Sequence, residues 1–264
     1  MKSMPQRNKP DYAAPALEKG IDILELLASE PEALTQNQIA VRLKRSTSEI
    51  FRMLDVLVRR GYVVRDAAGS YSQTLKLFEL AHRQVPGRRL IACALPVMER
   101  VSRLIRQSIH LSVHYDRRIL VVAQLDSPEP MSFSVRLGSH YPFRADRASA
   151  LVLTAFQSPE EQEVLVAEMV ANSAGRPDIR ALRTEIARVR RLGYYQKPSN
   201  VIRGVIQFSF PLFSGGSGAI AALASPYLRQ RDVKTGLVGA RNALAAAARE
   251  ISASLGADTA RARG

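Results

Sequence analysis

The chain has 264 residues, of which 46% are hydrophobic, so it can fill the core of one large or two modest domains and is not expected to be disordered throughout. Its formal net charge of +14 favours a polyanionic partner such as nucleic acid, although many basic proteins only carry a solvated arginine surface. No apolar run approaches the ~20 residues of a membrane span, and the first residues lack the apolar core of a signal peptide. Cys93 is the only cysteine, which excludes an internal disulfide and a multi-cysteine zinc site. We therefore expect a cytoplasmic protein without a membrane partner.

The chain begins with a polar, proline-containing stretch, residues 1–15, which we expect to be a flexible arm. Residues 16–29 have the spacing of an amphipathic helix that ends before Pro31. The side chains expected on its packing side are Leu17, Ile21, Leu24 and Ala28.

Residues 35–60 predict two short helices joined by a tight turn. Thr35 precedes Gln38 by three residues, and Ser46 precedes Glu49 by three, which is the spacing of a capping box at each helix start. Both helices have an apolar stripe, formed by Ile39, Ala40 and Leu43 in the first and by Ile50, Met53, Leu54, Leu57 and Val58 in the second. The alternative is an ordinary helical hairpin with a solvated charged face.

A β-hairpin is expected directly after these helices. Gly61 is suited to end the second helix, and residues 62–65 and 70–73 read as strands around a turn at 66–69. The order helix, helix, hairpin predicts a winged helix-turn-helix over residues 16–74.

The outward face of the second helix predicts contacts to DNA. Hydroxyl and guanidinium groups at the start of an exposed helix suit the base edges and phosphates of a major groove. We expect the contacts that position the protein on DNA phosphates to come from Arg42, Lys44, Arg45 and Arg65. Ser46, at the start of the helix, is also expected to lie at the DNA. We expect base reading by Thr47, Ser48 and Arg52, with Phe51 against a thymine methyl group.

The rest of the chain predicts a linker helix over residues 75–93 and an α+β domain over residues 94–256, followed by a flexible tail at 257–264. Pro96 fits best at a helix start. The expected strands are 108–115, 119–125, 131–137, 194–198, 204–211 and 219–225. The expected helices, packed on a mostly antiparallel sheet, are 147–156, 159–170, 178–192 and 231–255.

Three local patterns in this domain have two interpretations each. His110 and His114 share one strand face, but no third ligand is evident, so a structural or pocket-lining role is favoured over a metal site. The glycine-rich stretch 214–218 joins two strands, which favours a hairpin turn over a phosphate loop. Arg144 and Asp146 form a charged pair that is either a surface feature or part of a pocket. We find no nucleophile–base arrangement, and expect no catalysis, cofactor or metal.

Several stretches together resemble the IclR family of bacterial transcriptional regulators over residues 16–256. In the N-terminal part these are ALEKGIDILELLAS and LTQNQIAVRLKRSTSEIFRMLDVLVRRGYV. In the C-terminal part they are LPVMERVSRLIRQSIHLSV, LDSPEPMSFSVRLGSHYPF and GVIQFSFPLFSGGSGAIAALASP. The resemblance implies a winged helix-turn-helix, a linker helix and a GAF-like domain that binds a small metabolite, in a dimer or tetramer.

The resemblance also implies where the effector pocket lies. The corresponding residues are His110, Tyr141, Phe143, Arg144, Asp146, Ser149, Gln207, Phe208, Ala222 and Ala224. Gln207 stands where many members have cysteine, and Ala222 and Ala224 stand where serine is common. Fewer hydroxyl groups and several aromatic residues predict an aromatic acid or related metabolite as effector, with Arg144 as carboxylate partner.

The resulting hypothesis is a ligand-responsive, sequence-specific regulator of a catabolic pathway, bound to a partly palindromic operator. Two rivals remain. One is a structural DNA-binding protein that ignores sequence, and the other is a GAF-like ligand-binding enzyme with a vestigial helix-turn-helix. Footprinting distinguishes the first rival and a turnover assay the second.

Overall fold

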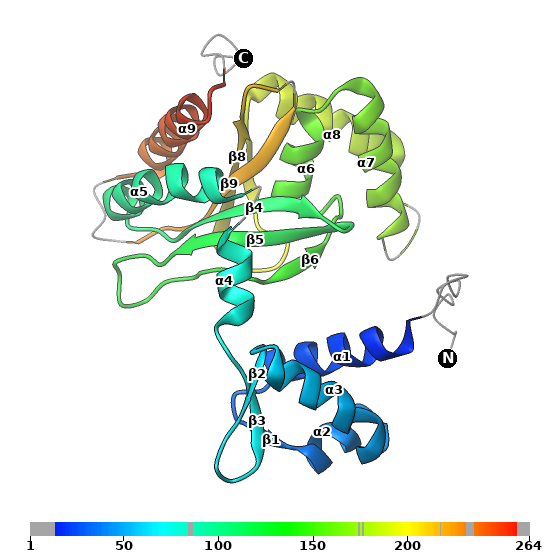
Figure 1. The fold of residues 1–264 in the computed structure, drawn as a ribbon. Helices are drawn as coiled ribbons and strands as arrows, with labels where there is room; N and C mark the ends of the chain where they lie inside the picture. Colours follow the sequence, from blue (N-terminus) through cyan, green and yellow to red (C-terminus); the bar gives the residue numbers. More distant parts are fainter. Residues whose placement is uncertain are drawn as a thin grey trace. The chain divides into compact units, whose positions relative to one another are not determined.

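The computed structural model describes residues 14–83, 87–173, 175, 177–216, 218–230 and 235–257, and the chain divides into two compact units, Met1–Val85 and Pro86–Gly264 (Figure 1). Most of the expected arm, residues 1–13, and of the expected tail, residues 258–264, lies outside this description. None of the described helices is long and apolar enough to cross a membrane.

The first unit is a winged helix-turn-helix. Its elements are α1 (Pro15–Ser29), β1 (Leu34–Thr35), α2 (Gln36–Arg42), α3 (Thr47–Arg59), β2 (Val63–Arg65), β3 (Ser70–Gln73) and α4 (Lys76–Arg83). The three strands form an antiparallel sheet in the order β1-β3-β2, so that β2 and β3 make the wing. Its core consists of Ile23, Leu27, Leu34, Ile39, Ala40, Ile50, Leu54, Val63 and Tyr71.

The predicted helix boundaries of this unit are confirmed by its hydrogen bonds. Thr35 and Gln38 form a capping box at α2, and Ser46 and Glu49 form one at α3. These bonds satisfy N–H groups that a helix start otherwise leaves without a partner. Gly61, with φ of +76°, ends α3 in a left-handed conformation that glycine adopts without strain.

The expected packing face of α1 is correct at Leu24, which packs against the core, but wrong at Leu17, Ile21 and Ala28. Leu17 and Ile21 are 64% and 44% exposed, whereas Ile23 and Leu27 are buried. Apolar residues occur on more than one side of this helix, and packing against α3 and β3 selects the stripe that includes Ile23 and Leu27. Periodicity alone could not make that choice.

The segment expected to be a linker helix, residues 75–93, falls in two described helices, and residues 84–86 between them lie outside the description. α4 ends at Arg83, and a separate helix, α5 (Arg88–Ile105), belongs to the second unit. Pro96 lies inside α5 rather than at its start. Proline removes one helical hydrogen bond, but Ala94, Val97 and Met98 beside it are all buried, and their packing holds the helix together.

The second unit has the expected α+β architecture. A six-stranded antiparallel sheet has the order β6-β5-β4-β9-β8-β7. The strands are β4 (Ile109–Tyr115), β5 (Arg118–Leu125), β6 (His140–Pro142), β7 (Tyr195–Pro198), β8 (Val205–Phe213) and β9 (Ala219–Leu228). α5 and α9 (Leu237–Ser254) cover one face (Figure 1). The other face carries α6 (Ala148–Ala155), α7 (Pro159–Ala171) and α8 (Ile179–Leu192).

The expected strand at 131–137 is absent, and the chain from Asp126 to Ser139 forms a loop. The carbonyl oxygen of Phe133 accepts a hydrogen bond from the Ser108 hydroxyl instead of from a neighbouring strand. Pro128 and Pro130 lack an N–H for a strand ladder, which favours the loop. The third strand of this region is β6, which starts at His140.

A β-bulge in β5 decides which of its residues face which layer. Leu111 of β4 pairs with Ala123, but Ser112 pairs with Val121, so Val122 is an extra residue. Side chains alternate along a strand, and one extra residue reverses the alternation. Residues 119 and 121 therefore face the α6 layer, while 123 and 125 join the core beneath α5 and α9.

Candidate functional site

The start of α3 presents a polar, basic surface. Thr47, Ser48 and Arg52 are exposed, and Phe51 is 55% exposed although Ile50 beside it is fully buried. The opposite stripe of α3 is held in the core by Ile50 and Leu54. The four exposed side chains expected to read bases thus lie on the free face of one helix.

The basic residues before α3 divide into two groups. Arg42 and Arg45 form ion pairs within the unit, with Glu30 at 3.2 Å and with Asp22 at 2.9 Å respectively. Arg45 therefore ties the turn to α1, and its role is at least partly structural. Lys44 is exposed, has a φ of +53°, and has no ion-pair partner among the residues described for this unit.

The cap of α3 is also held by charge. Ser46 donates its backbone N–H and its hydroxyl to the Glu49 carboxylate, and Lys19 lies 2.9 Å from the same group. The hydrogen bond from the Ser46 backbone, followed by that from Lys19, lowers the pKa of Glu49 to about 2. Ser46 is thus committed to the helix cap.

The wing and the first helix of the motif add two contacts. The Arg65 guanidinium lies 5.7 Å from the centre of the Tyr71 ring and close to Gly69 in the wing turn. Gln36 donates from its side chain to the Thr47 carbonyl at 3.0 Å, which joins α2 to the start of α3. Sequence reasoning missed Gln36, whose only signal is its place at the first position of α2.

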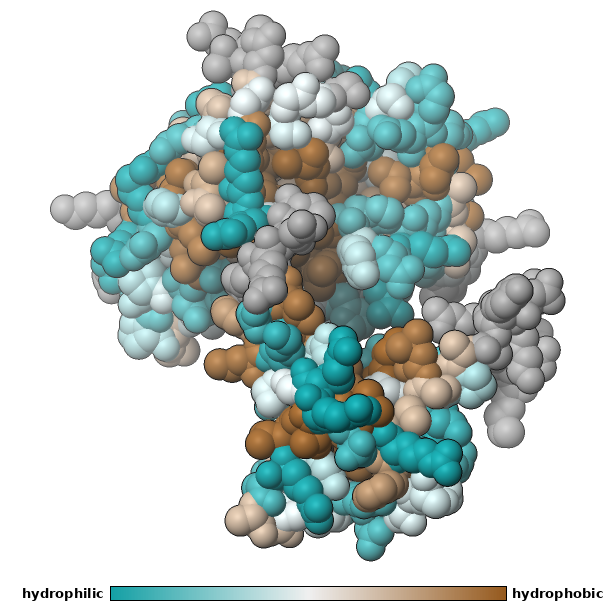
Figure 2. Space-filling model, in the orientation of Figure 1, coloured by the Kyte–Doolittle hydropathy of each residue, from teal (hydrophilic) through white to brown (hydrophobic). Residues whose placement is uncertain are grey.

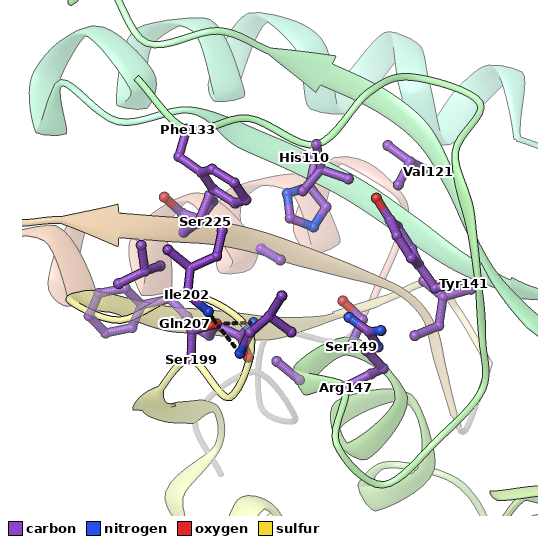
Figure 3. Close-up of a pocket in the computed structure, with 18 residues that line it drawn as sticks. His110, Val121, Phe133, Tyr141, Arg147, Ser149, Ser199, Ile202, Gln207 and Ser225 are labelled. Carbon is purple, nitrogen blue, oxygen red and sulfur yellow. Dashed lines mark hydrogen bonds between the residues drawn. The ribbon is translucent and has the colours of Figure 1, made fainter. Parts of the chain in front are cut away.

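The second unit contains a cavity of about 220 Å³ between the sheet and the start of α6, called the α6 cavity below (Figure 3). Its walls are mainly apolar and include Ile119, Val121, Phe133, Val135, Ile202 and Val205. Its polar side chains are His110, Tyr141, Arg147, Ser149, Ser199, Gln207 and Ser225.

The structure brings six of the ten expected pocket residues to this cavity: His110, Tyr141, Ser149, Gln207, Phe208 and Ala224. The other four lie elsewhere, each for a physical reason. Phe143 is fully buried with its ring edge against His114, at 4.5 Å between centres, and Ala222 is buried under α6. Arg144 and Asp146 bind each other at 3.0 Å and do not line the cavity.

The cation at the cavity is Arg147, which sequence reasoning missed. Its guanidinium lies 5.3 Å from the centre of the Tyr141 ring, and its Nε is buried and has no hydrogen-bond partner in the described structure. Asp146 Oδ1, 3.8 Å from that nitrogen, is likewise buried without a hydrogen bond. The available signal was its position immediately before α6.

The start of α6 offers further donors next to Arg147. The first N–H groups of a helix have no intrahelical partner and favour an anion. Ser149, in the first turn, receives a hydrogen bond from the Ser112 hydroxyl at 2.9 Å, which leaves its own hydroxyl hydrogen for another acceptor. Arg147, Ser149 and the helix start therefore form the anion-binding end of the α6 cavity.

His110 and Gln207 provide neutral polar groups on the β-sheet side. Burial lowers the pKa of His110 to about 4, so its imidazole is neutral at pH 7, and it forms no hydrogen bond with another described residue. Gln207 donates to the Ser199 hydroxyl at 3.4 Å, which leaves its amide oxygen as an acceptor. In Figure 3, His110 lies across the cavity from Arg147. A hydroxyl-bearing ligand could bond to either neutral group.

The described part of the chain contains no group of three or more His, Cys, Asp or Glu side chains that could hold a metal ion. His114 contacts Glu168 through Nε2 at 2.9 Å and does not line the α6 cavity. The cavity can thus bind a small ligand with one anionic group and an apolar body.

Comparison with known families matches both units. Residues 16–67 match the IclR helix-turn-helix domain, and residues 82–253 match the domain described as bacterial transcriptional regulator IclR C-terminal. The chain is 28% identical over 251 residues to the HTH-type transcriptional regulator KdgR of Escherichia coli K12, covering 94% of this chain and 95% of KdgR. It is 22% identical over 266 residues to the HTH-type transcriptional repressor AllR of the same strain, covering 97% of this chain and 98% of AllR.

Solved structures have the same fold. An IclR homolog from Microbacterium hydrocarbonoxydans, complexed with 4-hydroxybenzoate, superposes with a TM-score of 0.76 at 27% identity, covering 91% of this chain and 98% of that one. HmgR of Pseudomonas aeruginosa has a TM-score of 0.72 at 23% identity, covering 92% and 100%. The second likeness is evidence for the fold alone.

Proposed function

Because the chain belongs to the IclR family of bacterial transcriptional regulators, we propose that it binds a partly palindromic operator as a homo-oligomer, and that an aromatic carboxylate in the α6 cavity controls this binding. Ligand-responsive DNA binding follows from the family. The operator symmetry, the oligomer and the effector class are our proposals. Such a regulator acts in the cytoplasm and catalyses no reaction.

The observation that carries the effector class is the position of Arg147 in a mainly apolar cavity. A guanidinium can hold a carboxylate through two parallel hydrogen bonds, while apolar walls bury the rest of the ligand. The cavity, at about 220 Å³, is smaller than the ~300–1,000 Å³ typical of sites for drug-sized ligands. A single-ring acid suits both the charge and the size.

The ligand of the Microbacterium hydrocarbonoxydans homolog supports this choice. That protein was crystallised with 4-hydroxybenzoate and is 27% identical to this chain. In our proposal, the carboxylate contacts Arg147 and Ser149, and a ring hydroxyl bonds to His110 or Gln207. The Arg147 Nε forms no hydrogen bond in the described structure, and its nearest carboxylate oxygen is that of Asp146 at 3.8 Å. In our proposal the ligand carboxylate accepts the hydrogen bond that Asp146 does not form.

The proposed DNA contacts come from α3, the preceding turn and the wing. Thr47, Ser48 and Arg52 read bases, while Lys44 and Arg65 position the unit on phosphates. Arg42 is proposed to contact an adjacent DNA phosphate, whereas Ser46 acts by capping α3 and Arg45 mainly by holding the turn. The winged domain is proposed to span residues 16–74.

Oligomerisation is proposed because one winged domain reads too few bases for useful specificity. Exposed apolar side chains lie at the start of α4 and within it: Leu75, just before α4, is 79% exposed, and Leu77 and Leu80 in α4 are 38% exposed each. Hydrophobic surface is visible around α4 in Figure 2. Exposed apolar side chains on a short linker helix suit a contact with a second copy.

The DNA proposal is tested by selecting binding sites from a random DNA library and footprinting the protein on the selected site. We expect a defined protected region with related half-sites, occupied by two or more chains as measured by light scattering. Protection without a preferred sequence would favour the structural DNA-binding rival. One chain per site would contradict the oligomer.

The effector proposal is tested on the same site. We expect 4-hydroxybenzoate to change operator affinity, whereas pyruvate and glyoxylate at equal concentration should not. A response only to the short oxo-acids would overturn the aromatic class while leaving DNA regulation intact. Turnover of any of these acids by the purified protein would favour the enzyme rival.

A further inference from the structure

A second depression in the second unit lies where the end of α8 meets β8 and α9. Its volume is about 830 Å³. Its floor includes Phe210, Pro211 and Phe213 of β8. Its lining shares no residue with the α6 cavity. We call it the arginine groove, because three arginines, Arg191, Arg241 and Arg249, line it.

The charge of the arginine groove is uncompensated. No aspartate or glutamate lines it, and Arg191, Arg241 and Arg249 have no ion-pair partner in the described part of the chain. Elsewhere in the unit, Arg100, Arg183 and several other arginines do pair with a carboxylate. Three cations around one depression attract anions and repel one another until an anion binds.

Arg241 is oriented rather than freely mobile. Its guanidinium donates to the Asn242 side-chain oxygen at 3.2 and 3.3 Å and reaches the Tyr194 hydroxyl at 3.5 Å. It also lies 5.9 Å from the centre of the Tyr194 ring, which stacks on Phe210 at 5.3 Å. These neutral contacts hold the guanidinium without cancelling its charge.

The sequence of α9 leaves room above this floor. Ala245 and Ala248 line the groove between Arg241 and Arg249, so small side chains separate the two cations. The eight-residue spacing puts their Cα atoms about 12 Å apart along the helix axis. Long arginine side chains can close on one ligand from both ends, and this spacing suits a ligand with at least two anionic groups.

We propose that the arginine groove is a second small-molecule site, which binds a polyanion bearing two or more phosphate or carboxylate groups. Arg241 and Arg249 hold separate anionic groups, and Arg191 approaches from the end of α8. Arg191 also complements the negative end of the α8 dipole, so its share of the binding is the smallest. This proposal does not depend on the ligand of the α6 cavity.

The test titrates citrate and, separately, pyrophosphate into the full-length protein by isothermal calorimetry at constant ionic strength set with sodium chloride. We expect saturable binding of at least one of the two probes. Arg241→Gln and Arg249→Gln should each weaken it by about tenfold, the effect of removing one charge-assisted hydrogen bond. Preference for one probe identifies phosphate or carboxylate as the chemistry of the natural ligand.

Three matched variants locate the binding. Arg180→Gln removes an exposed cation from the opposite end of α8 and should leave the affinity unchanged, as should Arg52→Ala on α3 and Arg147→Gln at the α6 cavity. Absence of saturable binding by both probes overturns the proposal. Equal losses in Arg180→Gln and Arg241→Gln also overturn it, because the attraction would then be general. A loss of affinity for the probes that is confined to Arg52→Ala or Arg147→Gln would likewise overturn it, because the binding would then lie on α3 or in the α6 cavity.

Discussion

Replacing Arg147 with glutamine tests the central feature of the α6 cavity. Glutamine keeps a polar side chain but removes the charge and the two-pronged donor. A charge-assisted contact to a carboxylate contributes about 1.5–3 kcal/mol, so the affinity for 4-hydroxybenzoate should fall roughly 10- to 150-fold. Ser149 and the start of α6 remain, so binding should be weakened rather than abolished.

The assay compares two ligands by calorimetry. 4-Hydroxybenzamide has nearly the shape of 4-hydroxybenzoate but no charge, so the ratio of the two affinities isolates the contact to the carboxylate. The wild-type protein should prefer the acid, and Arg147→Gln should lose most of that preference. Loss of the contact with the Tyr141 ring should cost only about 0.5–1 kcal/mol of folding stability.

Arg144→Gln is the matched control, because Arg144 lies three residues away and binds Asp146 outside the cavity. We expect it to change either affinity by less than about threefold, well under the effect of losing a charge-assisted bond. An unchanged preference for the acid in Arg147→Gln would refute the assignment. A larger loss in Arg144→Gln would restore the expectation drawn from sequence.

Three other predictions concern DNA binding and stability. Arg52→Ala should weaken specific DNA binding by about 1–3 kcal/mol. Lys44→Ala should weaken binding to all DNA sequences alike and flatten its salt dependence. Gel-shift titrations that show neither effect would refute our orientation of α3. Burial lowers the pKa of His110 from 6.5 in the unfolded chain to about 4 in the folded protein. Between these two pH values the unfolded chain binds a proton that the folded protein does not. The contribution of His110 to the free energy of unfolding is therefore complete above pH 6.5, and this free energy should fall by up to about 3 kcal/mol towards pH 4. Urea unfolding should show a shallower pH dependence in His110→Gln, and equal slopes would contradict this account. Ser46→Ala should cost about 1 kcal/mol by removing the α3 cap, whereas Ser48→Ala should cost under about 0.5 kcal/mol; equal costs in urea unfolding would argue against the capping box.

Features set by neighbouring residues could be predicted from the sequence. The caps at Thr35 and Ser46, the end of α3 at Gly61 and the order of helices and wing all follow from short-range hydrogen bonds and backbone preferences. The long-range pairing of the antiparallel sheet could be predicted only in part. The α+β class of this unit follows from the alternation of strands and helices and from the family resemblance, but the register of the strands does not.

The failed predictions depend on contacts between distant residues. The exposed face of α1 is decided by α3 and β3, and the loop in place of a strand at 131–137 is held by Ser108. The cation at the α6 cavity is Arg147 rather than Arg144 because the turn before α6 directs them differently. A spacing of three residues in an irregular segment has no fixed geometry, so sequence alone could not distinguish them.

The extra residue in β5 has a consequence for how this regulator can diversify. Ile119 and Val121, on one side of the bulge, line the α6 cavity, while Ala123 and Leu125, on the other, belong to the opposite core. Loss of the single codon for Val122 would remove the bulge but leave Val121 opposite Ser112 and Ala123 opposite Leu111, so both pairs would keep their layers. Gain or loss of this residue therefore leaves the walls of the cavity in place, and the cavity is adjusted by point substitutions instead. A lineage that acquires a new effector should carry substitutions at positions 119 and 121 rather than a length change at Val122.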